Sequence, residues 1–218
     1  MDELQISIAD VQNRNEIRDF LMRHFLVEET MNVATKITED EFSPFAEHTF
    51  DTALHTPFSI ICRNGENGNI VGVALNTVRR RDDPPYKIPP GKPKRREIVT
   101  IDMICEEIHN GLWELIDPEI NTILELDILN VAHSFQRRGI AGKMLDKRNS
   151  SELLEEYGIQ GFICQASSYA NQMLLTGRGY QEIKSIPFNQ YTDDNGVPYI
   201  RPLDETKSVK LFWKPYNP

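Results

Sequence analysis

The sequence is poor in residues that cross-link small folds or bind metals. It has three cysteines, Cys62, Cys105 and Cys164, which lie far apart with no CxxC pair. This pattern argues against a disulfide framework or a zinc site and favours three reduced thiols in or near the core. The five histidines are scattered without HxH or HExxH spacing, so we expect no metal site.

Long apolar runs and an excess of positive charge are also missing. No apolar run approaches the roughly 18 residues that cross a bilayer, and the acidic start MDELQISIAD lacks the apolar centre of a secretory signal. The formal charge of -9 argues against a chain that binds nucleic acid or anionic membranes over its whole surface. We expect a cytoplasmic monomer without nucleic-acid or membrane partners. Its 218 residues, 39% of them hydrophobic, are enough for a sizeable core.

Hydrophobic periodicity in the first half predicts helices and a β-hairpin. LQISI at 4–8 alternates like a strand, and helical spacing follows from Val11, with His24 packed on or beside the apolar stripe. A weaker helix is expected over 42–56 and a well-patterned one over 101–115. Between them, FSIICRNGENGNIVGVALNTV predicts two strands around an Asn and Gly turn.

The second half alternates strands and helices. Its strongest strand pattern is NTILELDILNV, with one face formed by Leu124, Leu126 and Ile128 and the other by Glu125, Asp127 and Leu129. A helix is expected after it through about Tyr157, closed by Gly158. The strand IQGFICQAS, the helix SYANQMLLTGRGY and the strands QEIKSI and SVKLFWK follow. This order predicts a mixed α/β sheet in a single domain over residues 1–218.

One segment breaks this pattern. Residues 79–96, RRRDDPPYKIPPGKPKRR, carry eight basic residues, two acidic residues and five of the thirteen prolines. Proline at this density excludes a helix or a central strand, so we expect a solvated, extended loop. KPKRRE also has the composition of a nuclear-localisation signal, which stays an alternative interpretation of the same residues.

Residues 136–142, QRRGIAG, join the strongest strand to the helix after it. A strand, a glycine turn and a helix N-terminus present free backbone N–H groups and the positive end of a helix dipole, which suits a phosphate. Gly139 and Gly142 let such a ligand approach the backbone, and the two arginines add positive charge. The run is neither a P-loop nor a GxGxxG dinucleotide fingerprint.

In its context this turn resembles a known family. The strand end Leu129-Asn130-Val131 followed by Gln136-Arg137-Arg138-Gly139-Ile140-Ala141 is similar to the acetyl-coenzyme A motif of GNAT acetyltransferases, and Gly179-Tyr180 to the pair that closes a later helix in that family. From about residue 6 to 213 the chain resembles invertebrate arylalkylamine (dopamine-type) N-acetyltransferases, through FLVEETMN, GVALNTVRRR, RRGIAGKML and SSYANQ. The resemblance implies the GNAT fold: a mixed, mostly antiparallel central sheet splayed in the middle and flanked by helices.

The resemblance also implies an activity and a site. The expected reaction transfers acetyl from acetyl-CoA, as co-substrate, to the primary amine of a small arylalkylamine by direct attack. Glu29 would be the general base, with Ser167 and Asn171 in proton transfer, while Asp127 and Glu125 are alternative bases. The coenzyme-binding residues implied are Leu129, Asn130, Val131, Gln136, Arg137, Arg138, Gly139, Ile140, Ala141, Gly142 and Ser168.

Two parts of the expected site stay open. Leu175 stands where many GNAT enzymes have the tyrosine that protonates the leaving thiolate, so either the thiolate leaves unprotonated or Ser167 or Tyr169 donates the proton. Cys164 is expected to pack in the core and not to act as a nucleophile. Four aromatic residues lie in segments that fit a slot for an arylalkylamine, namely Phe42, Phe45, Phe188 and Tyr191.

Other functions also fit these motifs. The acceptor could be another amine such as a polyamine, or the donor a fatty acyl chain, because the acceptor pocket is what varies most. A non-catalytic acyl-CoA-binding protein would keep the coenzyme motif, whereas Glu29 and Ser167 favour an enzyme. The basic segment 79–96 would suit acetylation of nuclear proteins.

Overall fold

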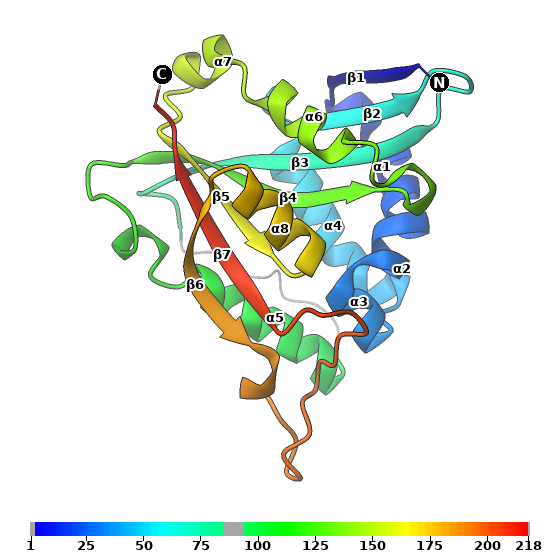
Figure 1. The fold of residues 1–218 in the computed structure, drawn as a ribbon, viewed down its shortest axis with the longest axis vertical. Helices are drawn as coiled ribbons and strands as arrows, with labels where there is room; N and C mark the ends of the chain where they lie inside the picture. Colours follow the sequence, from blue (N-terminus) through cyan, green and yellow to red (C-terminus); the bar gives the residue numbers. More distant parts are fainter. Residues whose placement is uncertain (1–2, 85–93, 218) are drawn as a thin grey trace.

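Within residues 3–84 and 94–217, which the computed structural model describes, seven strands form one sheet (Figure 1). The strand order is β1-β2-β3-β4-β5-β7-β6, and all neighbours are antiparallel except β4 and β5. The expected mixed, mostly antiparallel sheet is therefore confirmed. Its strands are β1 (Leu4–Ile8), β2 (Ile60–Asn64), β3 (Ile70–Arg80), β4 (Thr122–Val131), β5 (Gly161–Ala166), β6 (Gln181–Pro187) and β7 (Ser208–Pro215).

Helices cover both faces of the sheet. The helices after β4 pack on one face, and α8 lies in front of β5 in Figure 1, while α4 lies behind β3 and β4. Among the described helices, none is long and apolar enough to cross a membrane. They are α1 (Arg14–Phe20), α2 (Leu26–Glu28), α3 (Thr30–Thr35), α4 (Glu39–Ala53), α5 (Arg96–His109), α6 (Ile140–Arg148), α7 (Ser151–Glu156) and α8 (Tyr169–Gly177), with 3-10 turns at Val11–Asn13, Leu112–Glu114, His133–Phe135 and Phe188–Gln190.

The helical spacing predicted from Val11 is confirmed, but the helix is built of several segments. Ile17, Phe20 and Leu21 form its buried stripe. His24 packs at the edge of that stripe, with its ring centroid 4.9 Å from that of Phe20. The backbone widens into a π-helix over Leu21–Phe25, a distortion that often lies close to a functional site.

β4 and β5 diverge along their length. In the described part of the chain they pair over Leu124–Leu126 and Phe162–Cys164. Beyond these residues β4 continues beside β3 and β5 continues beside β7, and Figure 1 shows the two strands separating. One edge of Leu129–Val131 therefore faces a gap, and the splay expected in the middle of the sheet is confirmed.

A β-bulge in β4 changes the faces expected from strict alternation. Leu75 of β3 lies opposite Ile128, but Asn76 lies opposite Leu126, so Asp127 is the extra residue. Ile128 consequently packs with α1 and α4, on the opposite face to Leu126. The prediction that these two residues share a face is wrong because one extra residue shifts the alternation by one position.

Several predicted boundaries also differ. The helix expected over 101–115 begins earlier, at Arg96, and ends at His109, because Gly111 takes a left-handed φ of 74° that turns the chain into a 3-10 segment. The helix expected through Tyr157 is divided into α6 and α7. Gly158 follows α7 with a φ of 62°, which is the predicted glycine closure.

The loop predicted over 79–96 is shorter than expected. Arg79 and Arg80 belong to β3 and Arg96 begins α5. Residues 85–93 lie outside the described part of the chain. Arg79 stays in the sheet because its Nε donates to the buried carboxylate of Glu125 on β4 at 2.7 Å, so its charge is used inside the fold.

A buried arginine joins three elements of the core. Arg148, at the end of α6, is 1% exposed and donates to Asn76 Oδ1 at 3.1 Å and to the Tyr180 hydroxyl at 2.8 Å. Its guanidinium also lies 4.8 Å from the centroid of the Phe162 ring. A buried charge is tolerated only when it is hydrogen-bonded, so this cluster fixes α6 against β3 and the turn after α8.

Candidate active site

A cavity of about 130 Å³ lies where the splayed strands meet α3, α4 and α5. Its size is near that of a cavity of about 150 Å³ that accepts benzene. It brings together all three of the expected catalytic residues, Glu29, Ser167 and Asn171, with Leu129 and Ser168 from the expected coenzyme set. The remaining wall is mostly apolar, with Phe25, Met31, Ile37, Phe42, Pro44, Phe45, Ile98, Ile101, Cys105 and Ile128 among its residues.

Glu29 sits at a break between two helices. Its ψ of 138° ends α2, and its side chain caps α3 by accepting from the Asn32 N–H at 2.8 Å. The other carboxylate oxygen accepts a hydrogen bond from the Ser167 hydroxyl at 2.6 Å. Residues 138 positions apart in the sequence are thus joined across the mouth of the splay.

Burial raises the pKa of Glu29 above the usual range of a glutamate. Hydrogen bonds from Ser167 and from the backbone at Asn32 oppose this effect, and the charge of Asp204 adds to it. A carboxylate with a raised pKa is a better proton acceptor near neutral pH than an ordinary one. Its neighbour Glu28 accepts from His24 Nδ1 at 3.0 Å instead.

The two alternative bases have different surroundings. Glu125 accepts hydrogen bonds from His109 Nε2 at 2.6 Å and from Arg79 Nε at 2.7 Å. Burial raises the pKa of Glu125, but these two cations lower it further and hold it below the usual range. Asp127, on the bulge, lines the cavity with Glu29. Burial, followed by the charge of Glu125, raises the pKa of Asp127. Asp127 is therefore the alternative base that faces the cavity.

The predicted coenzyme turn is exposed and strongly curved. Arg137 and Gly139 both have left-handed φ values, 60° and 74°, an arrangement that makes successive N–H groups converge on an anion. Gln136 donates to the carbonyl of Val131 at 3.0 Å, which ties the turn to the end of β4. The first N–H groups of α6 lack intrahelical acceptors, and they belong to Ile140, Ala141 and Gly142.

The other expected coenzyme residues line the route from this turn to the cavity. Leu129 and Asn130 lie on the edge of β4 that faces the gap, and Asn130 Oδ1 is buried without a hydrogen-bond partner in the described chain. Arg138 lies over the Phe135 ring at 4.8 Å and donates to the Ser134 carbonyl. Ser168 caps α8 by accepting from the Asn171 N–H at 3.3 Å.

The groups considered for nucleophilic or acid roles are placed clearly. Cys164 is fully buried, and burial raises its pKa to about 12, so it packs in the core as expected. Leu175 is also fully buried in the core. Tyr169 is 44% exposed, whereas Ser167 lines the cavity. Of the two alternative proton donors, Ser167 is the one at the cavity.

The aromatic wall is partly different from the expected one. Phe42 and Phe45 line the cavity as predicted, and Phe25, which was not expected there, packs against Phe42 with ring centroids 5.7 Å apart. Phe188 is instead buried in the core beneath α5. Tyr191 lies in another cavity, where its hydroxyl bonds Glu107. Neither residue lines this cavity, because both follow β6, on the far edge of the sheet.

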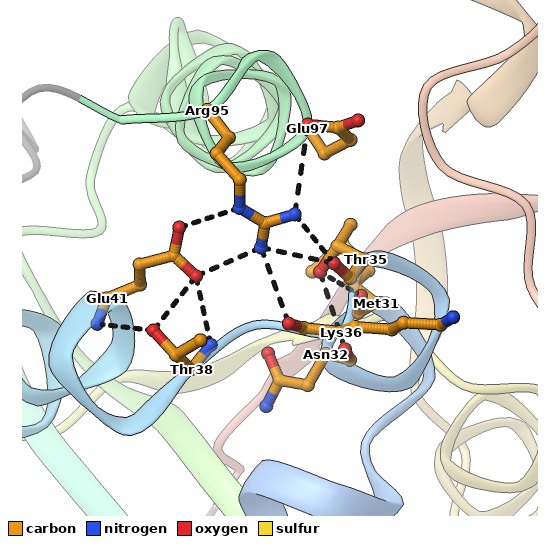
Figure 2. A network of polar contacts seen from close by, with 8 residues as sticks. All are labelled: Met31, Asn32, Thr35, Lys36, Thr38, Glu41, Arg95 and Glu97. Carbon is orange, nitrogen blue, oxygen red and sulfur yellow. Dashed lines mark hydrogen bonds and ion pairs between the residues drawn. The ribbon is translucent and has the colours of Figure 1, made fainter.

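An ion-pair network holds the helices around the cavity together (Figure 2). Arg95, just before α5, donates to Glu41 Oε1 at 2.8 Å and Oε2 at 2.9 Å and to the Thr35 carbonyl at the end of α3 at 3.2 Å. This arginine lowers the pKa of Glu41 to about 2. Next to it, Lys94 pairs with Asp102 at 2.5 Å. Local sequence patterns did not predict these pairings, which use the end of the basic segment.

No protein-family model and no curated protein matches this sequence. Solved structures match it over nearly its whole length. Arylalkylamine N-acetyltransferase 2 from Aedes aegypti is 22% identical, with 99% of this chain and 100% of that chain covered and a TM-score of 0.76. The polyamine N-acetyltransferase of Drosophila melanogaster, which forms N-acetylagmatine, is 15% identical with the same TM-score over 98% and 100% of the two chains.

The similarity extends to a bacterial protein. An acetyltransferase of the GNAT family from Staphylococcus aureus is 15% identical, with 98% of this chain and 99% of that chain covered and a TM-score of 0.55. At these identities the likeness concerns the fold. The chain has the fold of the GNAT acetyltransferases, and the solved structures that it resembles include insect arylalkylamine N-acetyltransferases.

Proposed function

We propose that this protein is an acyltransferase that moves the acetyl group of acetyl-CoA to the primary amine of a small arylalkylamine. The observation that carries the proposal is the Glu29–Ser167 pair at the wall of a cavity large enough for one ring, beside the gap between β4 and β5. We also propose that it acts as a monomer in the cytoplasm, without nucleic-acid or membrane partners. The charge of -9 supports the absence of nucleic-acid and anionic-membrane partners.

In the proposed mechanism the coenzyme and the amine bind to different groups of residues. The turn around Gly139 and the α6 N-terminus would hold the coenzyme phosphates, and the free edge of Leu129–Val131 would pair with its extended arm. The donor supplies a thioester, whose carbonyl carbon is the electrophile. The apolar wall with Phe42 and Phe45 would hold the ring of the amine and exclude water.

Proton transfer is the task of the carboxylate. Near neutral pH an alkylamine is an ammonium ion without a free lone pair, so it must lose a proton before it attacks. Glu29 would accept that proton directly or through a water. The amine nitrogen then attacks the thioester carbon and loses its second proton to solvent. The amide bond forms as the carbon–sulfur bond breaks and the thiolate leaves. Ser167, hydrogen-bonded to Glu29, would return a proton to the sulfur.

Two other functions remain alternatives to this proposal. One solved structure with this fold is a polyamine N-acetyltransferase, so a polyamine acceptor is the alternative within the same chemistry. The other is a protein that binds acyl-CoA without catalysis. The raised pKa of Glu29 favours the enzyme, because a protein that only binds the coenzyme has no need of a base near the acceptor cavity.

A thiol-release assay with acetyl-CoA against phenethylamine, tyramine, dopamine, serotonin, octopamine and spermidine tests the proposal. We expect turnover with the aromatic amines and a loss of roughly 10²-fold or more in Glu29→Ala. Glu28→Ala is the matched control, because Glu28 pairs with His24 outside the cavity lining. Coenzyme binding without turnover on any amine would favour the non-catalytic protein, and an equal loss in both variants would remove Glu29 from the mechanism.

A further inference from the structure

The carboxylates on the wall of the acceptor cavity are not equivalent. Among the described residues, four carboxylates line it: Glu29, Glu41, Asp102 and Asp127. A cavity with four unpaired carboxylates would attract cations of high charge, such as polyamines, whereas a cavity with one would select a monocation. The partners of each carboxylate therefore decide which class of amine fits, given the acetyl transfer proposed above.

Three of the four carboxylates already have a cation from the protein. Lys94 Nζ lies 2.5 Å from Asp102 Oδ2. Arg95 binds both oxygens of Glu41, at 2.8 and 2.9 Å. On the third, Arg79 Nη2 lies 3.7 Å from Asp127 Oδ1.

Glu29 differs from the other three. Its described partners are the Ser167 hydroxyl at 2.6 Å and the Asn32 N–H at 2.8 Å, and in the described part of the chain it forms no ion pair with a lysine or arginine. It is thus the wall carboxylate whose charge is left for the ammonium group of a substrate.

We propose that the acceptor cavity is built for one positive charge, and that Lys94 is the residue that excludes a second. Lys94 and its partner Asp102 both line the cavity, with side chains only 17% and 24% exposed. A second ammonium group would meet the Lys94 charge and a carboxylate that is already paired, and like charges in a partly desolvated site repel strongly.

The rest of the wall favours a neutral ring in the same space. Phe25, Phe42 and Phe45 form a row with successive ring centroids 5.7 Å apart, a spacing at which aromatic groups attract one another. The inferred substrate class is therefore a primary monoamine with an aromatic body. Diamines, and amines that end in a guanidinium group, are the class that the cavity rejects.

The test compares kcat/KM for phenethylamine with that for putrescine and agmatine. We expect the wild-type protein to prefer phenethylamine. Lys94→Met keeps the length of the side chain but leaves Asp102 without its cation, so the preference should fall at least about tenfold, or about 1.4 kcal/mol, through a lower KM for the dications. Lys94→Arg keeps the charge and should keep the preference.

The double variant Lys94→Met/Asp102→Asn is the decisive control. It removes the repelling charge of Lys94 together with the attracting charge of Asp102, so the gain with putrescine and agmatine should be smaller than in Lys94→Met. Melting temperatures check that each variant folds. An unchanged preference in Lys94→Met, no gain at all in the double variant, or a wild-type preference for putrescine would each overturn the inference while leaving acetyl transfer intact. No turnover with any amine would overturn the proposed function and the inference together.

Discussion

The hydrogen bond from Ser167 to Glu29 allows the sharpest test of the proposed base. Its length of 2.6 Å lies in the range of a charge-assisted O–H···O⁻ bond, so it stabilises the ionised form of the carboxylate. Burial acts in the opposite direction and is the larger effect on the pKa of Glu29. In Ser167→Ala the bond is lost and burial remains, so the pKa of Glu29 must rise further.

The sign and size of the effect on the rate follow. A base works when it is deprotonated, so a higher pKa moves the acidic limb of the kcat/KM profile to higher pH. A hydrogen bond to a charged group is worth roughly 1.5–3 kcal/mol. Losing the lower of these energies makes the ionised fraction of Glu29 about tenfold smaller at a pH below its pKa. Below the limb, Ser167→Ala should therefore lose about tenfold or more, and the loss should shrink as the pH rises.

The assay is thiol release at saturating acetyl-CoA with an amine whose own pKa is known, measured from about pH 5.5 to 9.5. Ser168→Ala is the matched control, because Ser168 caps α8 at Asn171 and does not contact Glu29 by any described hydrogen bond. It should lose about 1 kcal/mol of stability without moving the limb. An equal loss at every pH in Ser167→Ala would refute the effect of the hydrogen bond on the pKa of Glu29, and would leave proton return to the thiolate as the role of Ser167.

Two further predictions concern the coenzyme turn and the core. Gly139→Val places a β-branched residue at a φ of 74° with no atom within 4 Å of the new Cβ, so the turn should deform and coenzyme affinity should fall by about tenfold, a cost of roughly 1–2 kcal/mol. Gly158→Val, at a φ of 62° and equally uncrowded, should lower stability but leave that affinity unchanged, as isothermal titration would show. Arg148→Met leaves two buried polar partners unpaired and should lower the free energy of unfolding in urea by roughly 2 kcal/mol or more. A loss below about 0.5 kcal/mol would contradict the role given to that cluster.

Local patterns in the sequence were sufficient for the elements and for the glycine turn between β4 and α6. Alternation and helical spacing depend on neighbouring residues, so the strand over Thr122–Val131 and the helix after Gly139 were predictable. The meeting of Glu29 with Ser167 was expected from the family resemblance, since 138 residues separate them. No periodicity links positions so far apart in the chain.

The features that the sequence did not reveal depend on long-range contacts. The ion pair of Lys94 with Asp102 uses a lysine that composition assigned to a solvated loop. Phe188 and Tyr191 follow a strand at the edge of the sheet, which local sequence could not distinguish from one beside the cavity. The bulge at Asp127 could not be predicted from the alternation of polar and apolar residues. The strand shows this alternation both before and after the extra residue.

That bulge also determines which changes β4 can tolerate. The side of the sheet that a residue faces depends on whether its position is odd or even, and the extra residue reverses this parity midway along the strand. A substitution at Asp127 leaves the count unchanged. Its deletion would make Leu126 and Ile128 direct neighbours, on opposite faces as they are now. The strand would become regular, and the residues after the bulge would keep their faces. Loss of Asp127 should therefore remove one carboxylate from the proposed acceptor cavity and leave the edge of β4 that faces the gap in place.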